Sequence, residues 1–169
     1  MRSSNSLPAF LLAIRQSIVD AGVVPDKACQ ITTEERFLEY PQGQYLVMVI
    51  PGPIIPEYQE GAGYAETIFS GTLRFRLVAQ NVLDSAITDE LALTDTNTTT
   101  GLYVLFQKLL PVVRFWDGCD GINSYLIEPV HIAESGLTQP RRDSTHEQYI
   151  YMELPAQYRI CIATGGSAR

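Results

Sequence analysis

Cysteine and histidine are the side chains of this sequence from which nucleophilic or metal chemistry would most simply arise. Cys29, Cys119 and Cys161 lie far apart without a CxxC pair, and His131 and His146 have no metal-ligand spacing. A catalytic thiol needs a base beside it, and either histidine could serve Cys119 or Cys161. Cys161, however, lies in the alternating segment YRICIA, which favours a small, half-buried side chain. We therefore expect reduced thiols that act as small hydrophobic residues, with no zinc site and no disulfide framework.

Other motifs of catalysis or ligand binding are absent from the sequence. It contains no GxxxxGK[ST] or GxGxxG loop, no GxSxG elbow and no HExxH pair. Asp117 and Glu128 occupy the ends of a segment with the length of a calcium loop, but Ile122 stands where that loop needs glycine. No context marks a pair of carboxylates as acid and base. We expect a protein that is not an enzyme and that uses no metal and no cofactor.

Two arginine pairs are the basic features of the chain. Arg74 and Arg76 alternate with apolar residues, which places them on one face of a strand. That face is either solvated or in contact with acidic groups of a partner. Arg141 and Arg142 lie in QPRRDSTHE, which reads as a hairpin tip. The acids beside them favour a solvated tip, and contact with phosphate or with the acids of a partner is the alternative.

Large side chains lie on both faces of the segment near the C-terminus. Tyr149 and Tyr151 share one face with Glu153, while Ile150, Met152 and Leu154 point the other way. The strand is therefore covered on both faces, either within its own domain or by a neighbouring subunit. Aromatic residues are enriched at the centres of protein interfaces, which keeps the second interpretation open.

The segment PGPIIPEYQEGAG at 51–63 is the third candidate contact region. Its three prolines, followed by Gly61 and Gly63, predict an irregular loop, longer than the usual connection of about 4–6 residues. Long ordered loops are commonly functional, so we interpret it as a contact arm. Its candidate contact residues are Pro53, Ile54, Ile55 and Tyr58.

Hydrophobic periodicity predicts the elements that position these residues. An amphipathic helix over about 7–21 begins after Ser6 and ends before Gly22, and the stripe from Leu102 to Val113 predicts a second. Pro129 and Pro155 favour edge positions or bulges. The expected strands are 28–33, 44–50, 64–80, 123–133 and 147–163, with a short helical stretch at 84–93. This order, α-β-β-β-α-β-β, predicts an α+β fold: a mostly antiparallel or mixed sheet of about five strands with two main helices on one face.

Composition limits the class of protein. The 169 residues suit a single domain with a sizeable core and with flexible ends at 1–5 and 164–169, and a hydrophobic content of 46% excludes a disordered chain. No apolar run approaches the roughly 18 residues that span a membrane, and no cleavage site follows the apolar start, so we expect a soluble cytoplasmic protein. The net charge of −7 argues against tight nucleic-acid binding. A charged fraction of 18%, against about 25% on average, favours a surface partly covered by partners.

In order and pattern the sequence resembles the tail terminator, or tail completion, proteins of tailed bacteriophages and related particles. The resemblance covers nearly the whole chain. It rests on LPAFLLAIRQSIVDAG, QYLVMVIPG, FSGTLRFRLVAQNVLD followed by TDELALTD, GLYVLFQKLL, and EPVHIA with PRRDSTHEQYIYMELPAQYRICIA.

This resemblance implies a structural virion protein at the head–tail joint. In that family, subunits form a hexameric ring that caps the tail tube and joins it to the connector and neck proteins, while the genome passes through the channel. The implied partners are further copies of the chain, the tail tube protein and neck proteins, with DNA in transit and no membrane. An acidic subunit suits a channel that must not hold DNA.

Two alternatives stay open at this stage. The long segment at 51–63 and the long C-terminal hairpin would equally suit another neck component, a head completion or adaptor protein. A small cytoplasmic enzyme or ligand-binding domain with an unmarked site belongs to a different class. It would have a deep pocket with converging polar groups.

Overall fold

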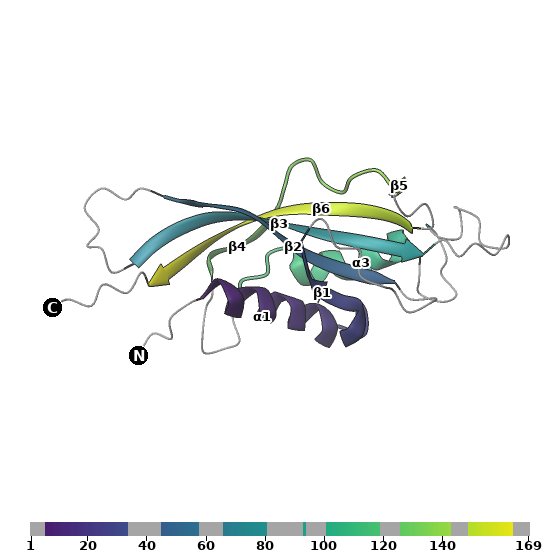
Figure 1. The fold of residues 1–169 in the computed structure, drawn as a ribbon, viewed down its shortest axis with the longest axis horizontal. Coiled ribbons are helices and arrows are strands. Elements are labelled where there is room, and N and C mark those ends of the chain that lie inside the picture. Colours follow the sequence, from purple (N-terminus) through teal and green to yellow (C-terminus); the bar gives the residue numbers. More distant parts are fainter. Residues whose placement is uncertain are drawn as a thin grey trace.

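Two helices lie together on one face of a mixed β-sheet in the computed structural model (Figure 1). The structure describes residues 6–33, 45–57, 66–80, 93, 101–118, 126–142 and 149–163. The helices are α1 (Leu7–Asp20) and α3 (Leu102–Val113), with a short 3-10 turn at Asp26–Ala28. The strands are β1 (Cys29–Ile31), β2 (Leu46–Pro56), β3 (Glu66–Gln80), β4 (Leu126–Ile132), β5 (Arg141–Arg142) and β6 (Tyr149–Ala163). The predicted α+β class, the element order and the one-sided helix layer are confirmed, with β5 as an additional short strand.

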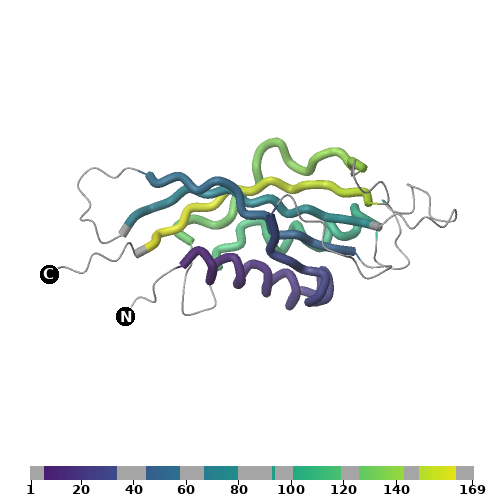
Figure 2. The backbone as a smooth tube through the Cα atoms, in the orientation of Figure 1, coloured from purple at the N-terminus to yellow at the C-terminus, as the bar shows by residue number. Residues whose placement is uncertain are grey.

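The sheet has the strand order β1-β2-β3-β6-β4, and β5 also pairs with β6. β1 runs parallel to β2, while all the other pairs are antiparallel. β3 and β6 pair along their whole lengths, from Glu66 opposite Ala163 to Gln80 opposite Tyr149. Figure 2 shows that β2, β3 and β6 continue together beyond the N-terminal end of α1, so one end of the sheet projects past the helix layer.

Helix α1 forms where the sequence predicts it. The Ser6 hydroxyl accepts a hydrogen bond from the Ala9 N–H at 3.2 Å, which caps the first turn. Gly22, with φ +68°, ends the helix. The apolar stripe faces the sheet and is buried: Phe10, Leu11, Ile14 and Ile18.

Helix α3 packs beside α1 over the same face. Its buried stripe has the expected spacing: Leu102, Leu105, Leu109 and Val113. Gly101 is its N-cap, without a side-chain hydrogen bond. Just past its C-terminal end, the Trp116 indole N–H donates to the Ser17 hydroxyl at 3.0 Å, and the Trp116 ring lies 5.7 Å from that of Phe10. These contacts join the two helices above the sheet.

The prediction that 51–63 is an irregular loop is wrong for its first part, because β2 continues to Pro56. The prolines fit because of where their nitrogens point. Thr32 N–H donates to the Val49 carbonyl, so Val49 and Pro51 direct their backbone groups toward the side of β1, which ends at Ile31. Glu57 N–H donates to the Ile68 carbonyl on β3, so the preceding Pro56 faces outward. Proline is tolerated at such edge positions, and a register shift lies between Pro51 and Ile54.

The prolines of β4 and β6 differ in their positions in the sheet. Pro129 lies in β4 at the sheet edge, within a register shift between Glu128 and His131, as predicted. Pro155 lies in β6, which is an interior strand, but at a point where no ladder pair forms on the side of β4. The Pro155 carbonyl accepts from Ala133 N–H just beyond the last residue of β4. Its nitrogen faces the same side, where the ladder to β4 has ended and no donor is needed.

Several expectations fall on residues outside the described parts of the chain: the helical stretch at 84–93 apart from Leu93, and both ends. Within those parts, no helix is long and apolar enough to span a membrane.

Candidate interaction surface

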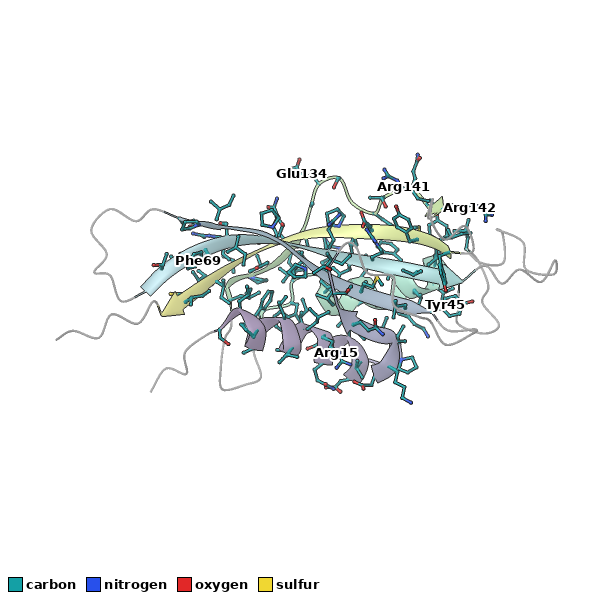
Figure 3. The ribbon with its side chains drawn as sticks, viewed as in Figure 1. Arg15, Tyr45, Phe69, Glu134, Arg141 and Arg142 are labelled. Atoms are coloured by element: carbon teal, nitrogen blue, oxygen red, sulfur yellow. The ribbon has the colours of Figure 1, made fainter. Side chains whose placement is uncertain are left out.

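The face of the sheet opposite the helices carries most of the polar side chains of the strands. On β3 the alternation is as predicted: Leu73, Phe75, Leu77 and Ala79 are buried toward the helices. Ser70, Thr72, Arg74 and Arg76 therefore lie on the other side, which we call the open face. Figure 3 shows side chains projecting from both sides of the strands.

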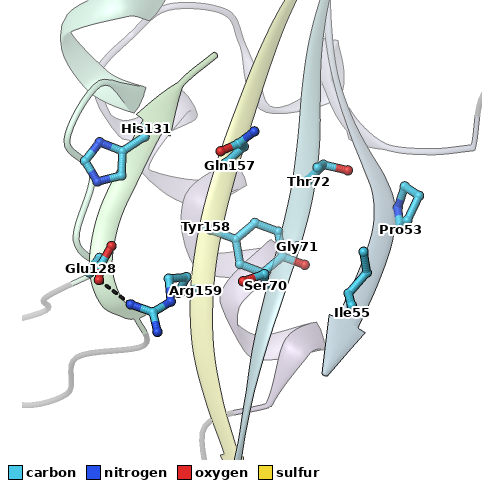
Figure 4. A pocket seen from close by; sticks show the side chains of 10 residues that line it. All are labelled: Pro53, Ile55, Ser70, Gly71, Thr72, Glu128, His131, Gln157, Tyr158 and Arg159. Atoms are coloured by element: carbon cyan, nitrogen blue, oxygen red, sulfur yellow. Dashed lines mark hydrogen bonds and ion pairs between the residues drawn. The ribbon is translucent and has the colours of Figure 1, made fainter. Parts of the chain in front are cut away.

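A groove with a volume of about 460 Å³ lies on the open face. Figure 4 shows its side chains in two rows, each crossing β4, β6, β3 and β2. One row is His131, Gln157, Thr72 and Pro53, and the other is Glu128, Arg159, Ser70 and Ile55. The rows follow the strand register, in which Arg159 stands opposite both Glu128 and Ser70.

Arg159 is the electrostatic centre of the groove. Its Nε and Nη2 donate to the two carboxylate oxygens of Glu57 at 2.8 and 2.6 Å, which is a bidentate pair. Its Nη1 donates to Glu128, and the Ser70 hydroxyl donates to Glu57. One guanidinium thus links β6 to β4 and to the residue that follows β2.

These contacts perturb the ionisation of the cluster. The hydrogen bonds from Arg159 and then from Ser70 lower the pKa of Glu57 to about 2, and the two carboxylates raise the pKa of Arg159. A carboxylate with so low a pKa is a weak base. The Ser70–Glu57 contact therefore suits the joining of strands better than the activation of a hydroxyl for attack.

The floor of the groove is thin because Gly71 has no side chain on the helix side of β3. The ring of Tyr158 occupies that space: a Cβ on Gly71 would lie 2.2 Å from Tyr158 Cζ. The same ring lies 4.6 Å from that of Phe10 on α1. Tyr158 is 2% exposed, and burial raises its pKa to about 12. The groove is thus backed directly by the core.

Arg74 and Arg76 lie beside an acid of their own chain. Both lie on the open face, but Arg76 is only 8% exposed and pairs with Glu153 on the adjacent β6, within the same chain. Arg74 Nη1 lies 3.7 Å from the same carboxylate. For Arg76 the expectation of a solvated face is therefore wrong, because the register places Glu153 opposite it, while a contact of Arg74 and Arg76 with a partner stays a prediction.

The second arginine pair lies beside the tyrosines, near the N-terminal end of β6. Arg141 and Arg142 form β5 and are exposed, opposite Tyr151 and Ile150 of β6. Tyr149 is 7% exposed, and Tyr151 is half-buried with the Arg76 guanidinium 4.7 Å from its ring centre. The sequence left open whether this strand is covered by its own domain or by a neighbouring subunit. Tyr149 is buried by residues of its own chain.

The contact-arm residues are divided between the groove and its surroundings. Pro53 and Ile55 line the groove, and Ile55 is 64% exposed. Ile54 is half-buried with its backbone opposite Gly71. Tyr58 lies outside the described residues.

The thiols behave as expected where they are described. Cys29 is buried, which raises its pKa to about 11, and Cys161 is half-buried. Cys119 and His146 are not among the described residues. In the described parts of the chain, no three histidine, cysteine or acidic side chains gather as a metal site.

Sequence reasoning missed the cluster of Glu57, Glu128 and Arg159. The available signal was the alternation of Arg159 with the buried Tyr158 and Ile160, which places it on the open face. Its partners lie 102 and 31 positions away along the chain, and only the strand register brings them together.

No protein-family model matches this sequence, and no curated protein matches it. The open-face groove and the α+β architecture are therefore the starting point for function.

Proposed function

We propose that this protein is a structural subunit of the head–tail joint of a tailed bacteriophage or a related particle. It assembles with copies of itself into a closed ring, caps the tail tube as a tail terminator, and connects the tube to the neck. The genome passes through the ring without specific binding, and the protein acts in the virion after assembly in the host cytoplasm. It needs neither a cofactor nor catalysis.

The observation that carries this proposal is the open face of the sheet. The described helices α1 and α3 both cover the opposite face, while the groove opens on this face between β2 and β4. Its rim includes Ile55, which is 64% exposed, and Pro53. An exposed apolar side chain at the edge of a concave surface is suited to a protein contact.

Internal ion pairing on that face also supports a contact surface. The chain neutralises charges on this face in two ion pairs, Glu57 with Arg159 and Arg76 with Glu153. Charges that are already paired and held in place can be covered by a neighbour with less loss of hydration than isolated charges. A head-to-tail contact of this face with a different patch on the next copy generates a ring when the rotation closes.

Element order and charge agree with the same proposal. The order α-β-β-β-α-β-β is the one on which the resemblance to tail terminators rests. The net charge of −7 would repel DNA from the wall of a channel.

A ligand-binding domain is the second candidate, and the groove itself favours it. Its volume of about 460 Å³ falls within the roughly 300–1,000 Å³ of small-molecule sites, and Ser70, Gln157 and His131 supply polar groups. A head completion or adaptor protein shares the class of the first candidate and differs from it in partner.

Native mass spectrometry across concentration and salt tests the proposal. We expect a discrete closed ring, either alone or on added tail tube. Ile55→Glu places a charge at the groove rim, and we expect this variant to remain as single subunits. Leu12→Glu is the matched control, because Leu12 is 59% exposed but belongs to α1 on the helix side. A monodisperse monomer at high micromolar concentration that does not assemble on tail tube would contradict the proposal and favour the ligand-binding domain.

A further inference from the structure

Phe115, just after α3, combines exposure with an unusual backbone conformation. Its φ is +61°, in the left-handed region that non-glycine residues rarely adopt, and its side chain is 58% exposed. Two backbone hydrogen bonds hold the turn against β4: Phe115 N–H donates to the Val130 carbonyl at 3.0 Å, and Val130 N–H donates to the Trp116 carbonyl at 2.8 Å. The chain thus maintains a costly conformation that directs a large aromatic ring outward.

The aromatic ring of Phe115 lies between two nitrogen-bearing side chains, those of Arg114 and His131. The Arg114 guanidinium carbon lies 4.9 Å from the Phe115 ring centre. The His131 imidazole meets the same ring edge-on, at 6.3 Å and 89°. Such contacts orient the aromatic side chain before any partner arrives, which reduces the entropy lost on binding.

A second cavity opens beside the Phe115 ring, on the helix side of the sheet, and His131 lines both this cavity and the open-face groove. The volume of the second cavity is about 420 Å³. Its apolar lining includes Phe106 and Leu110, one turn apart on α3, together with Leu137 and the buried Leu154 of β6. The lining is therefore mainly apolar, and the Arg114 guanidinium and the His131 imidazole are polar groups within it.

The charge at this cavity is opposite to that of the molecule. The chain carries −7, yet Arg114 is the only charged side chain among the described residues of the lining. Among those parts of the chain, no carboxylate forms an ion pair with Arg114. A ligand that is both apolar and anionic would match the wall and the cation together.

We propose that this cavity is a docking site for a short segment of a partner protein in which a bulky apolar side chain stands next to a carboxylate. The apolar side chain enters between Phe106 and Leu137 and packs on Phe115, while the carboxylate pairs with Arg114. Aromatic residues and arginine are the side chains that most often dominate binding energy at protein interfaces. The site does not depend on the closed ring of subunits proposed above, because Phe106, Arg114, Phe115 and Leu137 lie outside the open-face groove, although His131 lines both.

Titration of the ¹⁵N-labelled full chain with two peptides tests the site. The probes are acetyl-Glu-Asp-Phe-Leu-Asp-amide and its basic counterpart acetyl-Lys-Lys-Phe-Leu-Lys-amide. We expect the acidic peptide to shift the amide resonances of residues 106–116 and 131–137, and to bind at least about tenfold more tightly than the basic one. Arg114→Glu, at an exposed position, should reverse that preference.

Variants of Phe115 separate binding from folding. Phe115→Gly relieves the left-handed backbone, so it should leave the melting temperature unchanged or raise it while the acidic peptide loses most of its affinity. Ile55→Glu should bind the acidic peptide like the unmodified chain, which distinguishes this site from the proposed contact between subunits of the closed ring.

Three results would overturn the docking site. They are equal affinity for the two peptides, no binding of either at millimolar concentration, and resonance shifts confined to the open-face groove. A change in native mass on Phe115→Gly would instead show that a second copy of the chain covers the cavity, which also contradicts a segment of a different partner.

Discussion

Arg76 and Glu153 face each other across β3 and β6, and their side chains form an ion pair that is largely withdrawn from water. Nε and Nη2 of Arg76 both donate to Oε1 of Glu153, at 2.8 and 2.6 Å. The two side chains are only 9% and 14% exposed. The backbone of Glu153 is fixed in turn by Thr138, whose hydroxyl accepts from its N–H at 2.9 Å. Glu153 therefore contacts β3 through its side chain and the segment between β4 and β5 through its backbone.

Removing one partner of this pair should destabilise the protein strongly. Glu153→Ala leaves the buried Arg76 guanidinium without its carboxylate, which we expect to cost about 3–5 kcal/mol of unfolding free energy. The double variant Arg76→Met, Glu153→Leu should lose much less, because no buried charge remains. Urea unfolding followed by circular dichroism measures both.

The exposed Glu134 provides the control for this comparison. Glu134→Gln should change the unfolding free energy by less than about 0.5 kcal/mol. A loss for Glu153→Ala as small as that of the control would show that the pair contributes little to stability.

The Glu57–Arg159 contact predicts a dependence of stability on acid. The folded state lowers the pKa of Glu57 from 4.5 to about 2, so the unfolded chain takes up this proton first as the pH falls. The stabilisation is complete above about pH 4.5 and disappears progressively toward pH 2. Urea midpoints measured between about pH 6 and pH 3 should fall less steeply for Glu57→Gln, which cannot titrate there. If the urea midpoint fell equally steeply with pH in the unmodified protein and in Glu57→Gln, the lowered pKa of Glu57 would be contradicted.

Local patterns in the sequence were enough for much of this fold. The alternation in β3 and the helical spacing from Leu102 to Val113 correctly identify which side chains are buried, because each pattern depends on neighbours within one element. Ser6 and Gly22 likewise mark the ends of α1 through their own conformational preferences.

Features that depend on pairing between strands could not be predicted in this way. The outward direction of Pro51 and Pro56 depends on where β1 ends and on how β2 meets β3, so composition alone suggested a loop. Arg76 is buried because the register places Glu153 opposite it. The groove requires β4 and β2 to flank the β3–β6 pair, an order that no local pattern encodes.

The hydroxyl of Tyr158 is a buried polar group that the described residues leave without a hydrogen-bond partner. An unsatisfied buried hydroxyl costs about 1–3 kcal/mol, so its removal should be favourable. We expect Tyr158→Phe to raise the unfolding free energy by about 1 kcal/mol, while the ring contact with Phe10 is kept. The same variant should flatten the loss of stability between pH 10 and 12, where the unfolded chain ionises its tyrosine before the folded state does. A destabilised variant would indicate that the hydroxyl has a partner, such as an ordered water.

Gly71 should tolerate no side chain while Tyr158 is present. A Cβ there would lie 2.2 Å from Tyr158 Cζ and 2.4 Å from its oxygen, and the ring cannot retreat because Phe10 lies behind it. We expect Gly71→Ala to cost about 1–3 kcal/mol of unfolding free energy, as overpacking does in a dense core. Tyr158→Ala alone should cost more, because it leaves a cavity.

Combining the two substitutions isolates the contact between them. In a Tyr158→Ala background, the new methyl group of Gly71→Ala enters the space that the ring has vacated, so its own cost should fall close to zero. The double-mutant cycle should therefore give a coupling of about 1–3 kcal/mol, measured by urea unfolding of the four proteins. Additive losses would mean that Gly71 is needed for the backbone of β3 itself. The thin floor of the groove would then not depend on the Tyr158 ring.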